Sequence, residues 1–283
     1  MATLALVLIT AIWGWTFVPV KEAMAEVGPF WFLALRFSLA FLCTLPLLRR
    51  RNWPWKEALI LGLFLFGGYF FQTWGLRYTT AQKSGLITGL SVVLVPLVAR
   101  LFGEKSPWQM WFGVVLSGLG VAFLALGGEG SLGGSVFGDL LTVICAVSFA
   151  VYIALLARYS KSTAIGPLLP LQLFVVAGLS FVGAEANGEV QWTLSFRVWQ
   201  ALGITGILAS ALAYYVLAWA ESRASATKTA VILAMEPVFA AIFGWALLGE
   251  MLTPFQLGGA LLVLAGIVVV STVDRGKRGP DNR

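Results

Sequence analysis

The stretch AMEPVFAAIFGWALLGEMLTPFQLGGALLVLAGIVV, Ala234 to Val269, decides the fold because it contains most of two apolar runs joined by a short polar turn. The runs cover residues 229–249 and 254–273, and a membrane-spanning helix needs about 20 mostly apolar residues. Glu236 is the only charged residue in the first run, and Pro237 follows it directly. The stretch therefore predicts two membrane helices, one of which carries a carboxylate.

The same pattern extends along the whole chain of 283 residues. Hydrophobic residues make up 59% of it and charged residues only 11%, whereas soluble proteins contain about 25% charged residues. Cutting the chain at charged or turn-rich points gives ten apolar runs: 3–20, 28–48, 58–76, 84–102, 108–127, 139–157, 164–184, 198–220, 229–249 and 254–273. We therefore expect an all-α polytopic membrane protein with ten transmembrane helices.

The basic residues indicate which ends of the spans face the cytoplasm. If the N-terminus is cytoplasmic, the inside segments hold fourteen of them: Arg49, Arg50, Arg51, Lys56, Arg100, Lys105, Arg158, Lys161, Arg223, Lys228, Arg275, Lys277, Arg278 and Arg283. The outside segments hold four: Lys21, Arg77, Lys83 and Arg197. Because cytoplasmic loops are enriched in Lys and Arg, both termini are expected in the cytoplasm.

Composition also excludes several classes of function. The net charge of +6 comes from short clusters between the apolar runs rather than from a basic stripe, so no nucleic-acid partner is expected. The absence of histidine excludes a Ser-His-Asp triad and His-ligated zinc, and it leaves carboxylates as the groups that could titrate. Cys43 and Cys145 lie in apolar runs and are expected to pack as small hydrophobes. We expect no catalytic residue, no metal and no cofactor.

A Gly- and Ser-rich segment, residues 127–138, divides the chain into two similar halves. The halves are residues 1–126 and 139–273, followed by a polar cytoplasmic tail at 274–283. At offsets of 145 and then 146 residues the matching pairs are Tyr69 and Tyr214, Trp74 and Trp219, Ala81 and Ala226, Lys83 and Lys228, Glu104 and Glu250, Gly113 and Gly259, and Gly120 and Gly266. Because each half has five spans, an odd number, the duplication predicts two inverted-topology five-helix repeats.

Four stretches together resemble the EamA family of the drug/metabolite transporter superfamily. They are IWGWTFVPVKEA (Ile12 to Ala23), ALRFSLAFL (Ala34 to Leu42), GLRYTTAQKSGLITGLSVVLVPL (Gly75 to Leu97) and the opening stretch. The resemblance implies two EamA-like repeats and a ten-helix secondary transporter in the bacterial inner membrane, which exports amino acids or other small metabolites. The implied partners are a small-molecule substrate and the lipid bilayer, and a homodimer is left open.

One position departs from the family pattern. Trp15 stands where relatives often carry a small polar residue, and its bulk could narrow a substrate cavity.

Two charges, Arg36 and Glu236, lie well inside predicted spans, where an ionised side chain normally faces the bundle interior or a wet cavity. For Glu236 the alternatives are a proton-carrying or amine-binding group, and a structural partner of a nearby donor beside the bend at Pro237. For Arg36 the alternatives are a site for a substrate carboxylate, a neutralising partner of Glu236, and a structural tie to backbone carbonyls. Neither charge is repeated in the other half.

Other residues complete the predicted site. Glu104 and Glu250 end spans in both halves and are predicted to be gate or cap residues. The predicted cavity residues besides Glu236 are Trp13, Thr16, Gln72, Tyr78, Thr88, Ser91, Gln172 and Trp219. The three aromatic members adjoin polar or small residues, and the uncharged polar members could bind a zwitterion or simply join neighbouring helices.

The predicted function is secondary transport by alternating access, either proton-coupled or facilitative, with export of amino acids or related metabolites first. The alternatives are efflux of multidrug or cationic compounds, nucleotide-derivative transport, and a membrane scaffold without flux. An intramembrane enzyme would need a second acid in the spans or a nucleophile with its base, and the sequence has neither.

Overall fold

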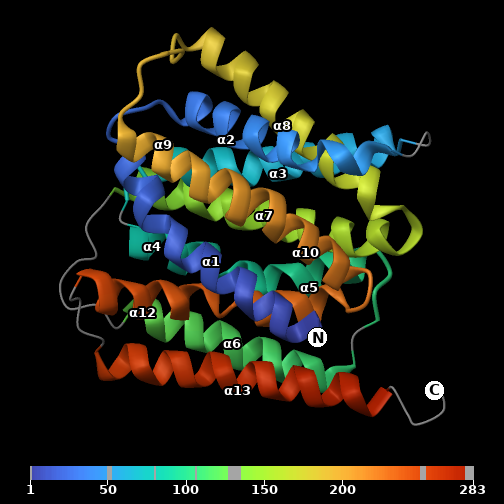
Figure 1. The fold of residues 1–283 in the computed structure, drawn as a ribbon. Coiled ribbons are helices and arrows are strands. Elements are labelled where there is room, and N and C mark those ends of the chain that lie inside the picture. Colours follow the sequence, from blue (N-terminus) through green and yellow to red (C-terminus); the bar gives the residue numbers. More distant parts are fainter. Residues whose placement is uncertain are drawn as a thin grey trace.

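The computed structural model describes residues 2–49, 53–79, 81–105, 107–126, 135–248 and 253–277. Over these residues every regular element is helical (Figure 1). Each of the ten predicted spans coincides with one helix or with consecutive helical segments. These are α1 (Ala2–Ala23), α2 (Pro29–Thr44) with the 3₁₀ turn η1 (Leu45–Arg49), α3 (Trp55–Gly75), α4 (Ala81–Thr88) with α5 (Ser91–Leu101), α6 (Trp108–Leu126), α7 (Val136–Ser162), α8 (Ile165–Ala186), α9 (Phe196–Gly203) with η2 (Ile204–Leu212) and α10 (Ala213–Glu221), α11 (Ala226–Leu233) with α12 (Glu236–Leu248), and α13 (Pro254–Lys277).

Within the described residues, six helical segments are long and apolar enough to cross a membrane by themselves. They are Ala2–Ala23, Pro29–Leu48, Trp55–Gly75, Val136–Ser162, Ile165–Ala186 and Phe196–Glu221. Shorter apolar helical stretches cover Trp108–Phe123 and Leu257–Val269. The chain is therefore a multi-pass membrane protein.

The helix ends differ from the predicted boundaries at the C-terminal side of the predicted linker and at the tail. Helix α7 begins at Val136, so the last three residues of the predicted 127–138 linker are helical. The Ser135 hydroxyl accepts a hydrogen bond from the Gly138 N–H, which caps this helix start. Helix α13 continues to Lys277, into the predicted tail, and residues 127–134 and 278–283 lie outside the described residues.

Two of the spans are broken in the middle. Helix α4 gives way to α5 at Gly89 and Leu90, and α11 gives way to α12 at Ala234 and Met235. The two breaks are 145 residues apart, which is the offset at which the halves align in sequence. Both therefore occur at matching positions.

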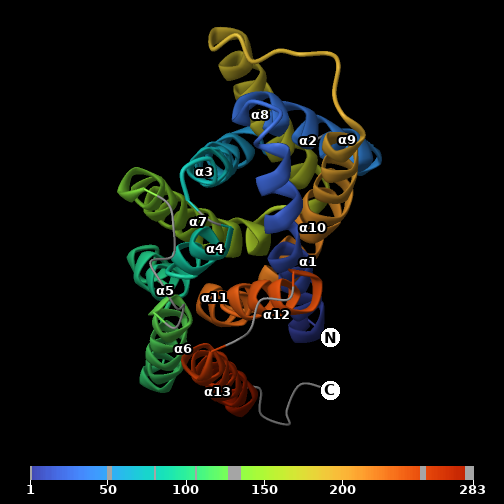
Figure 2. The ribbon, with the colours of Figure 1, turned by 90° about the vertical axis from the view of Figure 1, so that its left-hand side faces the viewer.

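The helices lie roughly side by side, with α2, α3 and α8 at one edge of the bundle and α6 and α13 at the other (Figures 1 and 2). Helices α1, α4, α5, α7, α10, α11 and α12 lie between these edges. Helix α1 begins and α13 ends on the same side of the bundle (Figure 1). The broken helices are thus enclosed by other helices at the middle of the molecule.

Glycines allow α6 and α13 to approach closely. A Cβ added at Gly120 would lie 2.6 Å from the Gly259 carbonyl oxygen, and one added at Gly266 would lie 2.6 Å from the Gly113 carbonyl oxygen. Small residues at such positions let helix backbones pack against each other in membranes. Gly113 matches Gly259 and Gly120 matches Gly266 in the sequence, so the two contacts are reciprocal.

Substituting Gly120 tests this packing. We expect Gly120→Val to lower the free energy of unfolding by about 1–3 kcal/mol, because the added atoms meet backbone that cannot move aside easily. Gly178→Val is the matched control, because nothing lies within 4 Å of a Cβ at that helical position. Thermal unfolding midpoints in detergent give the comparison, and equal midpoints for the two variants would contradict the close packing.

Candidate functional site

A cavity lies at the middle of the bundle, next to both helix breaks. Its empty space is about 670 Å³, a figure that includes the open mouth. Seven of the predicted site residues line it: Trp13, Thr16, Arg36, Gln72, Thr88, Ser91 and Glu236. The structure thus gathers side chains from α1, α2, α3, α4, α5 and α12 around one space.

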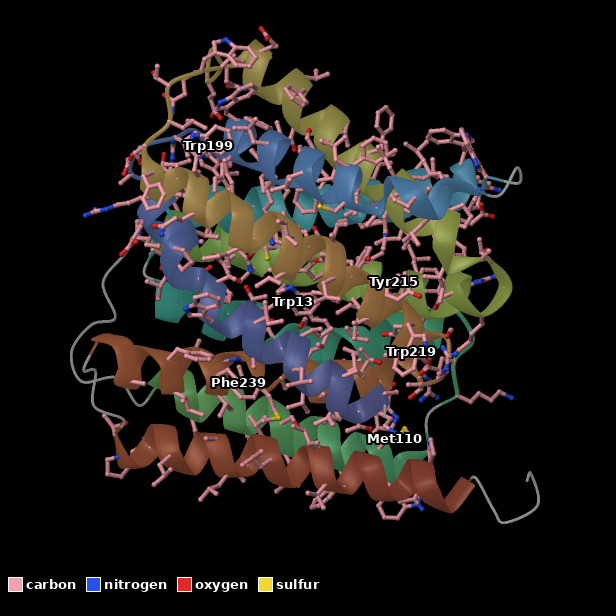
Figure 3. All side chains as sticks on the ribbon, in the orientation of Figure 1. Trp13, Met110, Trp199, Tyr215, Trp219 and Phe239 are labelled. Atoms are coloured by element: carbon pink, nitrogen blue, oxygen red, sulfur yellow. The ribbon has the colours of Figure 1, made fainter. Side chains whose placement is uncertain are left out.

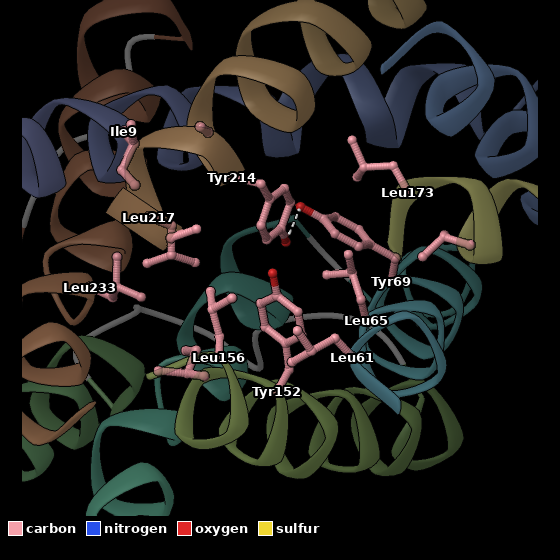
Figure 4. Close-up of a cluster of buried hydrophobic side chains, with 14 of the residues drawn as sticks. Ile9, Leu61, Leu65, Tyr69, Tyr152, Leu156, Leu173, Tyr214, Leu217 and Leu233 are labelled. Carbon is pink, nitrogen blue, oxygen red and sulfur yellow. Dashed lines mark hydrogen bonds between the residues drawn. The ribbon is translucent and has the colours of Figure 1, made fainter. Parts of the chain in front are cut away.

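Three tyrosines and Trp13 form an aromatic wall of the cavity. The Tyr214 hydroxyl donates to the Tyr69 hydroxyl over 2.9 Å, and the Tyr152 hydroxyl points towards the same place (Figure 4). The rings of Tyr214 and Tyr152 meet edge to face at 5.7 Å, and Trp13 packs 5.5 Å from Tyr214. Such arrangements are favoured by the quadrupoles of aromatic rings. The wall therefore holds hydroxyl groups in fixed positions beside the cavity.

Arg36 is 3% exposed and is held against this wall. Its Nε donates to the Ser210 hydroxyl over 2.9 Å, and Nη2 donates to the Tyr69 hydroxyl over 3.3 Å. The guanidinium carbon also lies 4.4 Å from the centre of the Tyr69 ring. No carboxylate lies within 4.0 Å of Arg36 among the described residues. Since a guanidinium has five N–H donors, this arrangement leaves donors for an anionic group of a ligand.

The π-helical segment η2 supplies partners for both Arg36 and Trp13. Ser210 accepts from Arg36, and the Ala209 carbonyl accepts from the Trp13 indole N–H over 2.8 Å. A π-helix shifts the backbone hydrogen bonding by one residue and is common at functional sites. Here the segment fixes the orientation of one cation and one aromatic side chain at the cavity.

Glu236 is the first residue of α12 and follows the second helix break directly. Helix α1 packs on this point through Gly14, where an added Cβ would lie 2.8 Å from the Glu236 carbonyl oxygen. The carboxylate has no hydrogen-bond or ion-pair partner among the described residues. The positive end of the α12 dipole favours a negative charge here. The structural alternative, in which a nearby donor or Arg36 pairs with Glu236, is not what the described residues show.

The uncharged polar lining is partly satisfied within the protein. Gln72 Nε2 donates to the Thr88 hydroxyl over 3.2 Å, and the Thr16 hydroxyl donates to the Trp13 carbonyl in its own helix. Ser91, the first residue of α5, follows the first helix break as Glu236 follows the second. The hydroxyl and amide groups therefore face the cavity from the side of α3, α4 and α5.

Three predicted cavity residues lie elsewhere. Tyr78 is 43% exposed at the end of α3, where its ring packs 5.3 Å from Phe137. Gln172 is fully buried in α8, next to Tyr152 but behind the cavity wall. Trp219 lies near the end of α10, below the guanidinium of Arg223 at 4.6 Å, whereas Trp13 lies near the middle of the bundle (Figure 3). Their polar neighbours in the sequence did not determine which way these side chains point.

Two further expectations have separate outcomes. The Glu104 carboxylate accepts hydrogen bonds from the Ala226 N–H at 3.1 Å and from the Thr227 hydroxyl at 3.1 Å, so it caps the start of α11. Glu250 lies outside the described residues.

Trp15 does not narrow the central cavity. It lines an apolar groove with residues of α1, η2, α10 and α12, because it follows Gly14 on a different face of α1 from Trp13.

Sequence reasoning did not select several residues of the cavity. Tyr69 and Tyr214 were available as a matched pair in the two halves, and their repetition was the signal that could have identified them. Tyr152 and Ser210 carried no such signal, because apolar residues surround both in the sequence. Only the rotation of their helices brings them to Tyr214 and Arg36.

Comparison with known proteins gives one family. The model of the EamA-like transporter family matches residues 1–126 and 136–272. A crystal structure of 22% sequence identity superposes with a TM-score of 0.78 and covers 98% of this chain and 99% of its own, which establishes the fold.

Curated relatives have transporter names. An uncharacterized transporter of Archaeoglobus fulgidus is 36% identical over 95% of this chain and 85% of its own length. A probable amino-acid metabolite efflux pump of Salmonella typhimurium is 26% identical, with coverage of 93% and 92%. The threonine/homoserine exporter RhtA of Escherichia coli is 30% identical, with coverage of 71% and 74%.

The hydrogen bond between the matched tyrosines can be tested with neighbouring substitutions. We expect Tyr214→Phe to lower the free energy of unfolding by about 1 kcal/mol, because it removes a buried hydrogen bond to Tyr69. Tyr215→Phe is the control, because Tyr215 is 42% exposed and a surface substitution usually changes stability by less than about 0.5 kcal/mol. Equal unfolding midpoints in detergent would show that the Tyr69–Tyr214 contact does not stabilise the bundle.

Proposed function

The chain belongs to the EamA-like transporter family, and on that premise we propose that it is a secondary transporter which exports amino acids or related small metabolites by alternating access. The observation that carries this proposal is the central cavity, which contains a buried guanidinium and a carboxylate that do not pair with each other among the described residues. A free amino acid has the complementary pair of charges. We propose that Arg36 binds its carboxylate and Glu236 its ammonium group.

The relatives and the lining of the cavity support an amino-acid substrate. The names of the Salmonella typhimurium and Escherichia coli relatives refer to amino-acid metabolites and to threonine and homoserine. Tyr69, Thr88 and Ser91 add hydroxyl groups to the same cavity, and these groups suit a small polar side chain.

Alternating access follows if the halves are inverted repeats, residues 1–126 and 139–273. Three observations support this arrangement: the helix breaks are 145 residues apart, the matched residues Tyr69 and Tyr214 touch each other, and the glycine contacts of α6 and α13 are reciprocal. Contact between equivalent residues is characteristic of a two-fold axis. In transporters with inverted repeats, one half rocks against the other around a site near the bilayer midplane.

We place the protein in the bacterial inner membrane with both termini in the cytoplasm. The support is the excess of Lys and Arg in the segments predicted to be inside, fourteen against four. The start of α1 and the end of α13 lie on one side of the bundle, as this topology requires (Figure 1).

Efflux of lipophilic cations is the second candidate. The aromatic wall and Glu236 favour it, because aromatic faces and a carboxylate both attract cations. Arg36 opposes it, because a cation entering the same cavity would meet a buried positive charge. The central cavity also counts against a scaffold without flux, for which a fully packed midplane would be expected.

Substitution of Arg36 separates the two candidates. In proteoliposomes we expect Arg36→Gln to weaken binding of amino-acid substrates about 10- to 100-fold, because it removes hydrogen bonds from a charged donor worth about 1.5–3 kcal/mol. Arg197→Gln, at an exposed position of α9, is the control. Transport of organic cations that rises in Arg36→Gln, with amino-acid transport absent in the wild type, would favour the second candidate. No saturable flux of any compound in a panel of amino acids, metabolites and cations would contradict transport itself.

Glu236 is proposed to couple transport to protons as well as to bind the ammonium group. We expect Glu236→Gln to abolish accumulation driven by a pH gradient, because a glutamine cannot release a proton, while substrate exchange without a gradient continues at a lower rate. Glu22→Gln, at an exposed position near the end of α1, is the control. If flux and its pH dependence are the same in Glu236→Gln and the wild type, the carboxylate is not the coupling group.

A further inference from the structure

A second buried carboxylate lies outside the cavity. Glu221 is the last residue of α10, it is 0% exposed, and neither carboxylate oxygen has a hydrogen-bond partner among the described residues. The Thr229 hydroxyl of α11, which is also fully buried, faces this carboxylate, and neither group has a hydrogen bond within 3.5 Å among the described residues. A fully buried carboxylate with so few partners is unusual, because buried charges are normally paired.

Glu221 and Thr229 lie close to the central cavity. Leu217 of α10 and Leu233 of α11 line the central cavity. Glu221 and Thr229 are four residues away from them, on the side of the bundle where α1 begins. Residues four apart lie on the same face of a helix. Glu221 and Thr229 therefore form a polar layer one helical turn away from the cavity-lining residues Leu217 and Leu233.

The charged groups around Glu221 are few. Glu104, from the connection between α5 and α6, and Lys161, from the exposed end of α7, are within electrostatic reach, and Thr229 faces it from α11. The other elements packed on α10 are α1, α8 and η2, and no charged side chain of these elements is among its neighbours in the described part of the chain.

The two carboxylates have opposite environments. Glu104 accepts hydrogen bonds at the start of α11, where N–H groups and the helix dipole stabilise a negative charge. Glu221 lies at the end of α10, where the dipole disfavours a negative charge, and the donor that faces it is the single hydroxyl of Thr229. Because Glu221 is fully buried, a charge on it would be poorly solvated, and the nearby Glu104 carboxylate adds repulsion. Glu221 is therefore suited to hold a proton.

We propose that Glu221 is a second proton-binding site, which holds a proton while the α10–α11 corner is closed against Glu104 and releases it to water when that corner opens. The O–H bond of the carboxylic acid breaks, the proton passes to water, and the carboxylate becomes hydrated. Closing the corner again requires a proton to return. This inference rests on the proposed transport function and adds to it a proton site separate from Glu236.

The other half of the chain has no corresponding group. At the repeat offset, Glu221 matches Leu76 at the end of α3. The backbone carbonyls of Leu76 and Thr79 accept hydrogen bonds from the Lys21 ammonium group instead. A proton site at only one of two matched corners would make opening sensitive to pH on one side of the membrane only.

Infrared spectroscopy of the purified full-length protein tests the site without any substrate. The comparison is made in the Glu236→Gln background, so that Glu236 cannot contribute a band. We expect this protein at neutral pH to show the C=O band of a buried carboxylic acid, and the added substitution Glu221→Gln to remove it. Glu221→Asp should restore a band at a shifted frequency, which guards against loss through misfolding. Glu185→Gln, at an exposed position of α8, should leave the band unchanged. A band that persists in Glu221→Gln, or that Na⁺ abolishes at constant pH, would overturn the proposal.

Flux measurements then separate this inference from the proposed function. In proteoliposomes we expect Glu221→Gln to exchange substrate as the wild type does. Driven by a pH gradient, however, this variant should accumulate at least tenfold less substrate than the wild type. Unchanged gradient-driven accumulation would contradict a role for Glu221 in coupling. If the wild type moves no compound of the panel, the proposed transport function fails, and the infrared result still decides whether Glu221 binds a proton.

Discussion

A helix that crosses hydrocarbon can break only where its freed backbone groups face protein or water, and the rest of this structure depends on that constraint. The breaks between α4 and α5 and between α11 and α12 both lie inside the bundle. Thr88 and Ser91 flank the first break and Glu236 follows the second, and all three line the central cavity. The interrupted helices end beside the cavity, where their backbone groups face protein or water. The residues at those ends supply much of the polar surface of the cavity.

The contacts between the matched halves and the chemistry of the site are made by different residues. Tyr69 and Tyr214, and the glycines of α6 and α13, are repeated and join one half to the other. Arg36, Glu236 and Glu221 are not repeated. If the halves are inverted repeats, as proposed, their two-fold arrangement can hold two equivalent conformations in balance, but it cannot by itself give transport a direction. The unrepeated charges are therefore the groups on which direction and proton dependence should depend.

The sequence predicts well where the helices lie along the chain, but it predicts poorly which side chains point into the bundle. Ten apolar runs mark the spans because hydrocarbon tolerates few charges, and Arg36 and Glu236 were identified for the same reason. Helices that are apolar on every side carry no stripe that shows which face turns inward. Tyr78 and Trp219 were therefore expected in the cavity, while Tyr152, which does line it, was not. Glu221 was missed because a charge at the end of a span normally lies in water.

The net charge of the cavity determines which kind of ligand it can bind. When Arg36 is positive and Glu236 is ionised, the cavity is neutral, and a zwitterion keeps it neutral while giving each charge a partner. A cation would leave one uncompensated positive charge in a partly dry space, which costs free energy because the surrounding protein and lipid solvate it poorly. Protonation of Glu236 removes the partner of the ammonium group and leaves Arg36 alone. In the proposed mechanism, proton binding and amino-acid binding at Glu236 therefore compete, and that competition is the condition for exchanging one for the other across a membrane.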